Sequence, residues 1–193
     1  MWVLGEDGVK VADPKSVGVS MKDYKKAVKI DALISNKTNL YLFLLTADCA
    51  PVILYDPLMK VLGLVHVGWK GSDLNIVGKA IKSLSNKFKS KPKDLIVGIG
   101  PAARKNSFIK DNPLQKNGPK WKGFLENVGE GKYKVDFIGL CKKQLKDSGV
   151  LERNIFDCYI DTVHDNRFFS HVREGKLPLR QQGRFACVVG IKK

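Results

Sequence analysis

A chain of 193 residues is long enough for one domain, and its 44% hydrophobic and 9% aromatic content excludes a disordered protein. No stretch approaches the roughly 18–20 consecutive apolar residues that a membrane-spanning helix needs. The N-terminal residues also lack the basic start and apolar core of a signal peptide. These features predict a soluble cytoplasmic protein.

The net charge of +15 comes mostly from lysines that are spread along the chain. They are not gathered into an arginine-rich stripe with interleaved aromatic residues, which would be typical of a nucleic-acid footprint. We therefore expect a solvated lysine surface, with nucleic-acid binding as the less favoured alternative. The same charge would attract an anionic substrate.

The four cysteines are well separated and form no CxxC pair, so disulfides are not expected in a cytoplasmic chain of this size. Cys141 and Cys187 lie in apolar runs and are interpreted as small buried hydrophobic residues.

Runs of β-favouring residues predict short strands separated by turns. In chain order the expected strands are Val9–Ala12, Ile30–Ser35, Leu40–Thr46, Val52–Tyr55, Val61–Val67, Leu95–Ile99, Ile155–Ile160 and Phe185–Ile191. The continuous apolar character of Leu40–Thr46 predicts a strand covered on both faces. The residues Ala47–Ala50 are interpreted as a break before the next strand, and Pro51 cannot donate a ladder hydrogen bond at its own position. The following two strands predict a hairpin.

Helices are expected at Met21–Val28, Asp73–Phe88 and Val135–Ser148, where apolar residues recur at helical spacing. Ser72 and Asp73 are the candidate N-caps of the second helix, and Asp136 lies in the first turn of the third. The polar, proline- and glycine-containing stretch 105–134 predicts loops with at most one short helix.

Cys49 and His66, each at the end of a predicted strand, form the strongest candidate site. A thiolate and an imidazole bind Zn²⁺ well, although a catalytic zinc needs three protein ligands. The same two groups could form a thiolate–imidazole dyad with His66 as the base, or both could be packed core residues. Asp48 either helps to orient this site or caps the turn before Pro51.

The turn Gly68–Gly71 follows the histidine directly and precedes a helix. Backbone N–H groups at such an entry can hold an anion such as phosphate, and Lys70 could add a point charge. The spacing matches neither a P-loop nor a dinucleotide fingerprint.

A second polar and aromatic cluster occupies Arg167–Arg173. Its Ser170, His171 and Arg173, together with His164, are candidates to approach a ligand. The alternative is a strand end with solvated charges.

Several motifs together resemble the laccase-domain family, whose members were long described as multicopper polyphenol oxidases. TADCAPVILYDP and VLGLVHVGWKGS carry the resemblance, and IDALIS, VGIGPA, RFFSHVREG and GRFACVVGI extend it over roughly residues 30–191. The resemblance implies one α/β domain over residues 1–193, layered α/β/α around a mixed sheet and lacking the N-terminal part of typical members.

The family is now regarded as purine nucleoside phosphorylases with adenosine deaminase activity. The resemblance therefore implies phosphorolysis of adenosine, inosine, guanosine or methylthioadenosine at a zinc centre of two histidines and one cysteine. Cys49 and His66 match two of these ligands, with Asp48 beside them, and we expect Lys70, Arg173 and Ser170 to bind substrate or phosphate.

Three departures from the family pattern stand out. The other histidine of the family is missing from Val3–Gly8, where Glu6 or Asp7 could substitute as an oxygen ligand. Lys70 replaces the usual arginine of the Gly-Trp-Arg-Gly turn, which loses a planar fork of donors. The residues usually found after Gly-Pro-Ala are replaced around Asn106–Phe108.

The expected function is thus zinc-dependent purine nucleoside phosphorolysis by a monomer or homodimer, with adenosine deamination as a second expected activity. The alternatives are a degenerate member that binds a nucleoside or RNA without turnover, and a Cys–His hydrolase. Copper oxidase chemistry ranks lower, because three histidines are too few for a multicopper cluster.

Overall fold

A computed structural model of the chain describes residues 8–12 and 30–193. Its centre is a six-stranded mixed sheet in the order β1-β2-β5-β4-β6-β10. The strands are β1 (Val9–Val11), β2 (Ala32–Ser35), β5 (Val61–Val67), β4 (Ala50–Asp56), β6 (Ile96–Ile99) and β10 (Ile155–Asp157). The two outer pairs, β1–β2 and β6–β10, are parallel, and the inner pairs are antiparallel.

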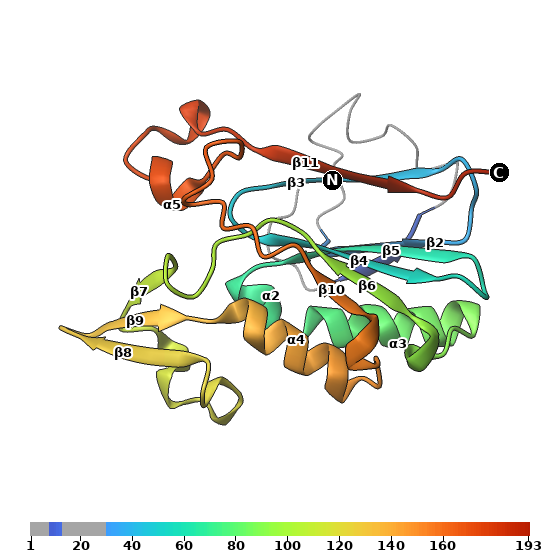
Figure 1. Cartoon of the computed structure of the whole chain (residues 1–193), viewed down its shortest axis with the longest axis horizontal. Helices are drawn as coiled ribbons and strands as arrows, with labels where there is room; N and C mark the ends of the chain where they lie inside the picture. The colour runs from blue at the N-terminus through green and yellow to red at the C-terminus, as the bar shows by residue number, and fades with distance from the viewer. Residues whose placement is uncertain (1–7, 13–29) are drawn as a thin grey trace.

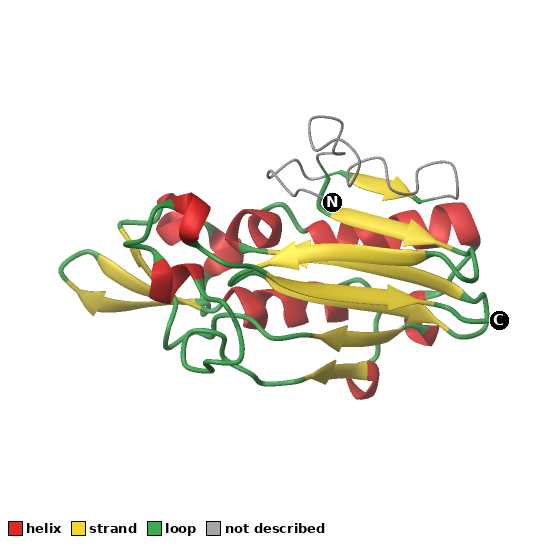
Figure 2. Cartoon of the chain, turned by 90° about the horizontal axis from the view of Figure 1, so that it is seen from above, coloured by secondary structure: helices red, strands yellow, loops and turns green. Residues whose placement is uncertain are grey.

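Helices cover one face of this sheet, and a two-stranded antiparallel sheet covers the other (Figures 1 and 2). The helices are α2 (Trp69–Asp73), α3 (Ile76–Phe88) and α4 (Phe137–Asp147), and the second sheet pairs β3 (Tyr41–Thr46) with β11 (Phe185–Gly190). The predicted single-domain α/β fold with a mixed sheet is confirmed. In the part of the chain described, the layer opposite α3 and α4 consists of β3 and β11.

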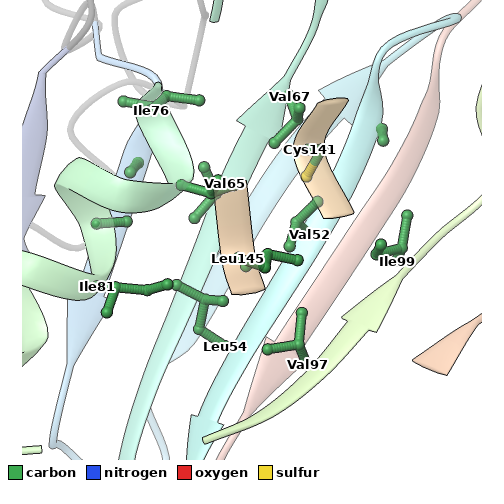
Figure 3. Packing of buried hydrophobic residues seen from close by; sticks show 14 of the residues in the cluster. Val52, Leu54, Val65, Val67, Ile76, Ile81, Val97, Ile99, Cys141 and Leu145 are labelled. Carbon is green, nitrogen blue, oxygen red and sulfur yellow. The ribbon is translucent and has the colours of Figure 1, made fainter. Parts of the chain in front are cut away.

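Alternation along β5 explains why the central sheet is buried on both faces. Val65 and Val67 belong to the core shared with the helices, whereas Leu62 and Leu64 belong to a smaller core shared with β3. Figure 3 shows the larger core, in which Val52, Leu54, Val97 and Ile99 of the sheet meet Ile76, Ile81, Cys141 and Leu145 of α3 and α4. This packing holds β4 and β5 rigidly side by side up to their ends.

The hairpin of β4 and β5 is confirmed, and so is the break after Thr46, which occupies residues 47–49, but the predicted start of the next strand at Val52 is wrong. β4 already begins at Ala50, and Pro51 pairs with His66 of β5. The carbonyl oxygen of Pro51 accepts from Gly100 N at 2.9 Å, and β6 ends at Ile99. The position where Pro51 lacks an N–H therefore faces the β6 side at the end of the ladder, where Gly100 N donates to Pro51 and proline cannot return a bond.

The prediction that Leu40–Thr46 is covered on both faces is also wrong. Tyr41 and Leu45 are 54% and 38% exposed, while Leu42 and Leu44 between them are buried. β3 lies in an outer layer of the molecule, so only one of its two faces meets the core.

The second and third predicted helices are confirmed with changed starts. Asn75, not Ser72 or Asp73, caps α3, and its left-handed backbone (φ 54°) separates α3 from the short α2. Its side chain accepts from Gly78 N at 3.2 Å. Asp136 caps α4 by accepting from Gly139 N at 2.7 Å. The helix expected at Met21–Val28 lies outside the described residues.

The stretch 105–134 is not the loop region that its composition predicts. It contains a three-stranded antiparallel sheet in the order β7-β9-β8, which protrudes from one end of the molecule (Figure 1). The strands are β7 (Ile109–Asp111), β8 (Leu125–Gly129) and β9 (Lys132–Val135), with short 3-10 turns at Leu114–Asn117 and Pro119–Trp121. We call residues 105–135 the arm.

The remaining short elements are α5 (His171–Glu174) and 3-10 turns at Pro92–Asp94, Glu152–Asn154 and Leu179–Gln181. All four cysteines are free, and Cys141 is fully buried, as expected for a small hydrophobic residue. Burial raises the pKa of the Cys141 thiol to about 12. None of the described helices has the length and apolar character needed to cross a bilayer.

Candidate active site

A cavity of about 450 Å³ lies where β3 passes into β4 and where β5 passes into α2. α2, α5 and the arm gather at this end of the molecule (Figure 1). The cavity is lined by Asp31, Ala47, Asp48, Cys49, His66, Gly68, Trp69, Lys70, Gly71, Phe108, Lys110, Phe137, His171 and Val172. Five of the residues predicted from the sequence therefore meet in one place: Cys49, His66, Asp48, Lys70 and His171.

Cys49 and His66 are brought together by the β4–β5 hairpin, in which Ala50 is paired with Val67 and Pro51 with His66. Nδ1 of His66 lies 3.1 Å from Oδ1 of Asp31, and Cys49 lines the same cavity as these two residues. Because Asp31 occupies Nδ1, Nε2 is the imidazole nitrogen that remains for another partner. We call Cys49, His66 and Asp31 the thiol–imidazole–carboxylate row.

The electrostatics of this row favour a charged imidazole. Burial alone would lower the pKa of His66, but the hydrogen bond and negative charge of Asp31, together with the neighbouring Cys49, outweigh it and raise the pKa to about 9. The two acidic groups thus stabilise the imidazolium form.

Gly68 is the point of closest approach between the Gly-Trp-Lys-Gly turn and the cysteine. A Cβ atom placed on Gly68 would lie 2.5 Å from Sγ of Cys49, which is far inside van der Waals contact. Gly68 has an ordinary extended backbone (φ −108°), so the requirement for glycine here comes from the thiol and not from the backbone conformation.

Asp48 uses both carboxylate oxygens within the protein. Oδ1 accepts from Thr162 Oγ1 at 2.6 Å, and Oδ2 accepts from Val172 N at 2.7 Å. Asp48 is 5% exposed and ties the turn that carries Cys49 to the segment around α5. The hydrogen bonds of the Asp48 side chain thus reach distant residues and not its own turn, and its role in orienting the site stays a prediction.

The rest of the cavity wall combines aromatic rings with lysine. Trp69, Phe108 and Phe137 contribute apolar faces, and each is braced by a second aromatic contact or by the core. The ring centroids of Trp69 and Trp121 are 4.6 Å apart, and those of Phe108 and Phe137 are 5.3 Å apart in an edge-to-face arrangement. Such a wall suits a flat apolar ring system.

Arg173 and Ser170 do not line this cavity. The Arg173 guanidinium donates to the backbone oxygens of Thr162, Val163 and Phe168 at 2.6–3.1 Å. The Ser170 hydroxyl is buried and accepts from Arg173 N at 3.1 Å as the N-cap of α5. Both side chains stabilise the α5 segment in this geometry, so their expected contact with phosphate stays a prediction without support from their position.

The other two histidines differ in position. His171 lines the cavity, and its Nδ1 lies 2.6 Å from Oε1 of Gln182. His164 is not among the lining residues.

Several lining residues are not foreseen from the sequence. Asp31 belongs to the IDALIS segment but follows the first residue of a predicted strand, where its side chain gives no sign of an imidazole partner 35 residues away. Phe108 and Lys110 lie in a stretch interpreted as loop, and Phe137 is an unremarked apolar residue of a predicted helix. Only the pairing of distant strands brings these residues to Cys49.

A metal is expected from the resemblance, and the described residues offer two ligands for it, Cys49 and His66. In residues 8–12 and 30–193 no group of three His, Cys, Asp or Glu side chains is arranged to hold a metal ion. A catalytic zinc site takes three protein ligands, so this part of the chain does not complete one. Asp7, the proposed oxygen ligand, lies outside the described residues, as does Glu6.

The fold and the site define a mixed α/β protein with a cysteine–histidine site at the end of its central sheet. The family model for multi-copper polyphenol oxidoreductase laccase matches residues 6–192. The chain therefore belongs to this laccase-domain family, as the motifs predict.

Characterised relatives have a shared name. The chain is 28% identical over 202 residues to the purine nucleoside phosphorylase YlmD of Bacillus subtilis, with 99% of this chain and 71% of the relative covered. It is 32% identical over 154 residues to a purine nucleoside phosphorylase of Clostridium acetobutylicum, with 79% and 64% covered. The chain thus spans 71% of the length of the first relative and 64%, slightly less than two thirds, of the second.

Solved structures agree on the fold. The hypothetical protein YfiH of Bacillus licheniformis superposes with a TM-score of 0.87 at 27% identity. The superposition covers 98% of this chain and 72% of the YfiH chain. YlmD of Geobacillus stearothermophilus superposes with a TM-score of 0.86 at 24% identity and shows the fold alone.

Proposed function

We propose that this chain catalyses the phosphorolysis of purine nucleosides, with inorganic phosphate as the second substrate. The observation that carries the proposal is the cavity that Cys49, His66 and Asp31 share with an aromatic wall and Lys70. The family and the names of its relatives support the same reaction class. Adenosine, inosine, guanosine and methylthioadenosine are the proposed nucleosides, and adenosine deamination is a proposed second activity.

In phosphorolysis a phosphate oxygen forms a bond to C1′ of the ribose while the bond from C1′ to the purine nitrogen breaks. The purine leaves with the electron pair of that bond and takes up a proton, which yields the free base and ribose 1-phosphate. A site for this reaction must bind an anion, hold a flat base and supply a proton to the leaving group.

Each requirement has a candidate residue in the cavity. Lys70 attracts the phosphate, and Trp69, Phe108 and Phe137 pack against the base. His66, held at Nδ1 by Asp31, donates a proton from Nε2 to the leaving purine. Because the described residues provide two metal ligands and not three, these roles are assigned to the side chains themselves.

The direct test is incubation of the protein with inosine and phosphate, followed by chromatography for hypoxanthine and ribose 1-phosphate. We expect both products in equal amounts, and neither when phosphate is omitted. Cys49→Ala and His66→Ala should each reduce turnover by at least about 100-fold. Full turnover by either variant would remove the pair from the site.

A cysteine hydrolase is the second candidate, and one specific observation favours it. The row Cys49–His66–Asp31 gathers a nucleophile, a base and an orienting carboxylate in one cavity, with the base held by the carboxylate, and activated cysteine enzymes use such a set of groups. Such an enzyme would be inactivated by alkylation of Cys49, inhibited by zinc and activated by a chelator. Phosphate-dependent product formation would decide against it.

A third candidate is a member that binds a purine nucleoside or RNA without turnover. The two-ligand site in the described residues favours it. Retained inosine binding by calorimetry, with no product after prolonged incubation, would identify this case.

A further inference from the structure

Lys110 is a second lysine of the cavity, contributed by the arm. It lies on β7 opposite Tyr133 of β9, far along the chain from Lys70 at the start of α2. Both lysines line the same cavity of about 450 Å³. The three-stranded sheet of the arm thus delivers a positive charge to a site that the β4–β5 hairpin builds.

The ammonium group of Lys110 differs from those of its neighbours because it has no acidic partner. Lys105 and Lys134 are paired with Glu126, and Lys132 with Glu130. Within the described residues no carboxylate lies within ion-pair distance of Lys110 or Lys70. The recorded contact of Lys110 Nζ is the face of the Phe108 ring, 4.7 Å from its centroid, a cation–π contact that leaves the N–H groups unused.

Phe108 keeps the base of this lysine in place. Its carbonyl oxygen accepts from Val135 N at 2.9 Å, and its ring packs edge-to-face on Phe137 at the start of α4. The start of β7 is therefore anchored to the core of the domain, even though the tip of the arm projects outward (Figure 1).

The acidic groups of the cavity are already engaged. Asp31 contacts His66, and Asp48 accepts from Thr162 and Val172. Among the described residues, the charged side chains of the cavity that have no oppositely charged partner are the two lysines. A cavity whose unused charges are both positive selects an anion that carries more than one negative charge.

We propose that Lys70 and Lys110 together bind a phosphoryl group, so that Lys110 is a specificity-determining residue of this site. The inference rests on the proposed function, in which Lys70 attracts the phosphate, and adds Lys110 as a second residue of that anion site. The shared chemistry is a phosphoryl dianion, which comes either from inorganic phosphate or from the 5′-phosphate of a purine nucleotide.

The test compares Lys110→Met with Lys122→Met, which removes the same charge from an exposed position on the arm outside the cavity. Binding of inorganic phosphate, inosine and inosine 5′-monophosphate is measured by calorimetry, so that the result does not depend on turnover. We expect Lys110→Met to weaken binding of phosphate or of the nucleotide about tenfold, because one charge-assisted contact is lost. Binding of inosine should change less than about twofold.

Two outcomes support the proposal and identify the source of the phosphoryl group. Weaker binding of inorganic phosphate, with a KM for phosphate raised about tenfold and an unchanged kcat, identifies the co-substrate. Weaker binding of the nucleotide alone identifies a phosphorylated nucleoside. The proposal is overturned if wild type, Lys110→Met and Lys122→Met bind inorganic phosphate with equal affinity and also bind inosine 5′-monophosphate with equal affinity, with unchanged circular dichroism. If the wild type shows no turnover but Lys110→Met still weakens phosphate binding, the result counts against phosphorolysis and not against the role of Lys110.

Discussion

Nδ1 of His66 lies 3.1 Å from Oδ1 of Asp31. His66 is the next-to-last residue of β5, and Asp31 directly precedes β2. The two strands are antiparallel neighbours in the central sheet, and Asp31 O also accepts from His66 N at 2.7 Å. Backbone and side chain of Asp31 therefore both hold His66, which gives the imidazole one orientation toward Cys49.

Asp31→Asn should lower activity about 10- to 100-fold with little loss of stability, because the amide preserves size but loses the charge that orients and stabilises the imidazole. The measurement is kcat/KM for inosine phosphorolysis, accompanied by NMR titration of His66 in metal-free protein. The pKa of His66 should fall from about 9 toward 6.5. Asp147→Asn, which removes a surface carboxylate paired with Lys143, is the matched control. Equal activity of the two variants would contradict an orienting role.

Gly68→Ala should displace the Cys49 thiol and reduce activity more than tenfold while the fold is retained. The added Cβ would lie 2.5 Å from Sγ, and the flexible end of the cysteine side chain is what must move. Reaction of Cys49 with a disulfide reagent and kcat measure the two effects. Gly98→Ala is the control, since its Cβ would meet Ile53 at an ordinary 3.9 Å. An active Gly68→Ala protein would show that the position of the thiol is not critical.

Arg173→Met should change the stability of the protein, whereas Lys70→Met should change its binding of phosphate. The loss of three donations to backbone oxygens should lower the free energy of unfolding by about 2 kcal/mol in Arg173→Met. Lys70→Met should leave stability unchanged and raise the KM for phosphate about tenfold. Urea denaturation and steady-state kinetics test both. A higher KM for phosphate in Arg173→Met at unchanged stability would restore the role predicted from the sequence.

Asp157 gives a pH dependence of stability whose sign is defined. Burial would raise its pKa, but the hydrogen bonds from Arg104 and Lys142, at 2.7–2.9 Å, hold the pKa below the ordinary 3.8. The carboxylate therefore stabilises the fold above the unfolded-state pKa, and this contribution is lost as the pH falls through the folded-state pKa. Asp157→Asn should cost about 2 kcal/mol at pH 7, after allowance for the partial exposure of both cations.

Denaturation of wild type and Asp157→Asn between pH 7 and pH 2 checks this expectation. The difference between the two unfolding free energies should shrink as the acid limit is approached. A difference that is constant over the whole range would show that the charge of Asp157 does not contribute.

Zinc should bind more weakly than at a three-ligand site, because Cys49 and His66 are the two ligands that the described residues supply. We expect dialysis against a chelator to remove zinc without unfolding the protein, and Cys49→Ser to reduce binding further. Competition with a chromophoric chelator measures the affinity. One tightly held zinc per chain would show that a residue outside the described ranges, such as Asp7, completes the site.

The parts of the fold that the sequence predicts are those where one apolar period runs without interruption. β5 is predicted at its observed bounds because Val61–Val67 is a buried run between two turns. α3 and α4 follow from apolar spacing, whereas Asp136, expected in the first turn of α4, is its N-cap. The arm is missed because β7, β8 and β9 are polar and gain their order from pairing with one another.

The site is predictable only in its local half. Cys49, His66 and Lys70 are close in sequence, and a hairpin between them is enough to bring them together. Asp31 and Lys110 reach the same cavity through strand pairings that no local pattern encodes. Conversely, Arg173 has the residue type of a phosphate ligand, but the backbone oxygens of its own segment take up its guanidinium.

The hydrogen bond from Val172 N to Asp48 also has a dynamic consequence. α5 has four residues, far fewer than the roughly 12–15 that a helix needs to persist alone in water. Its opening must break the bond to Asp48, the residue next to Cys49. The rate at which the Val172 amide exchanges with solvent deuterium therefore reports how often the turn that carries Cys49 loses this contact. Any ligand that orders the turn should lower that exchange rate.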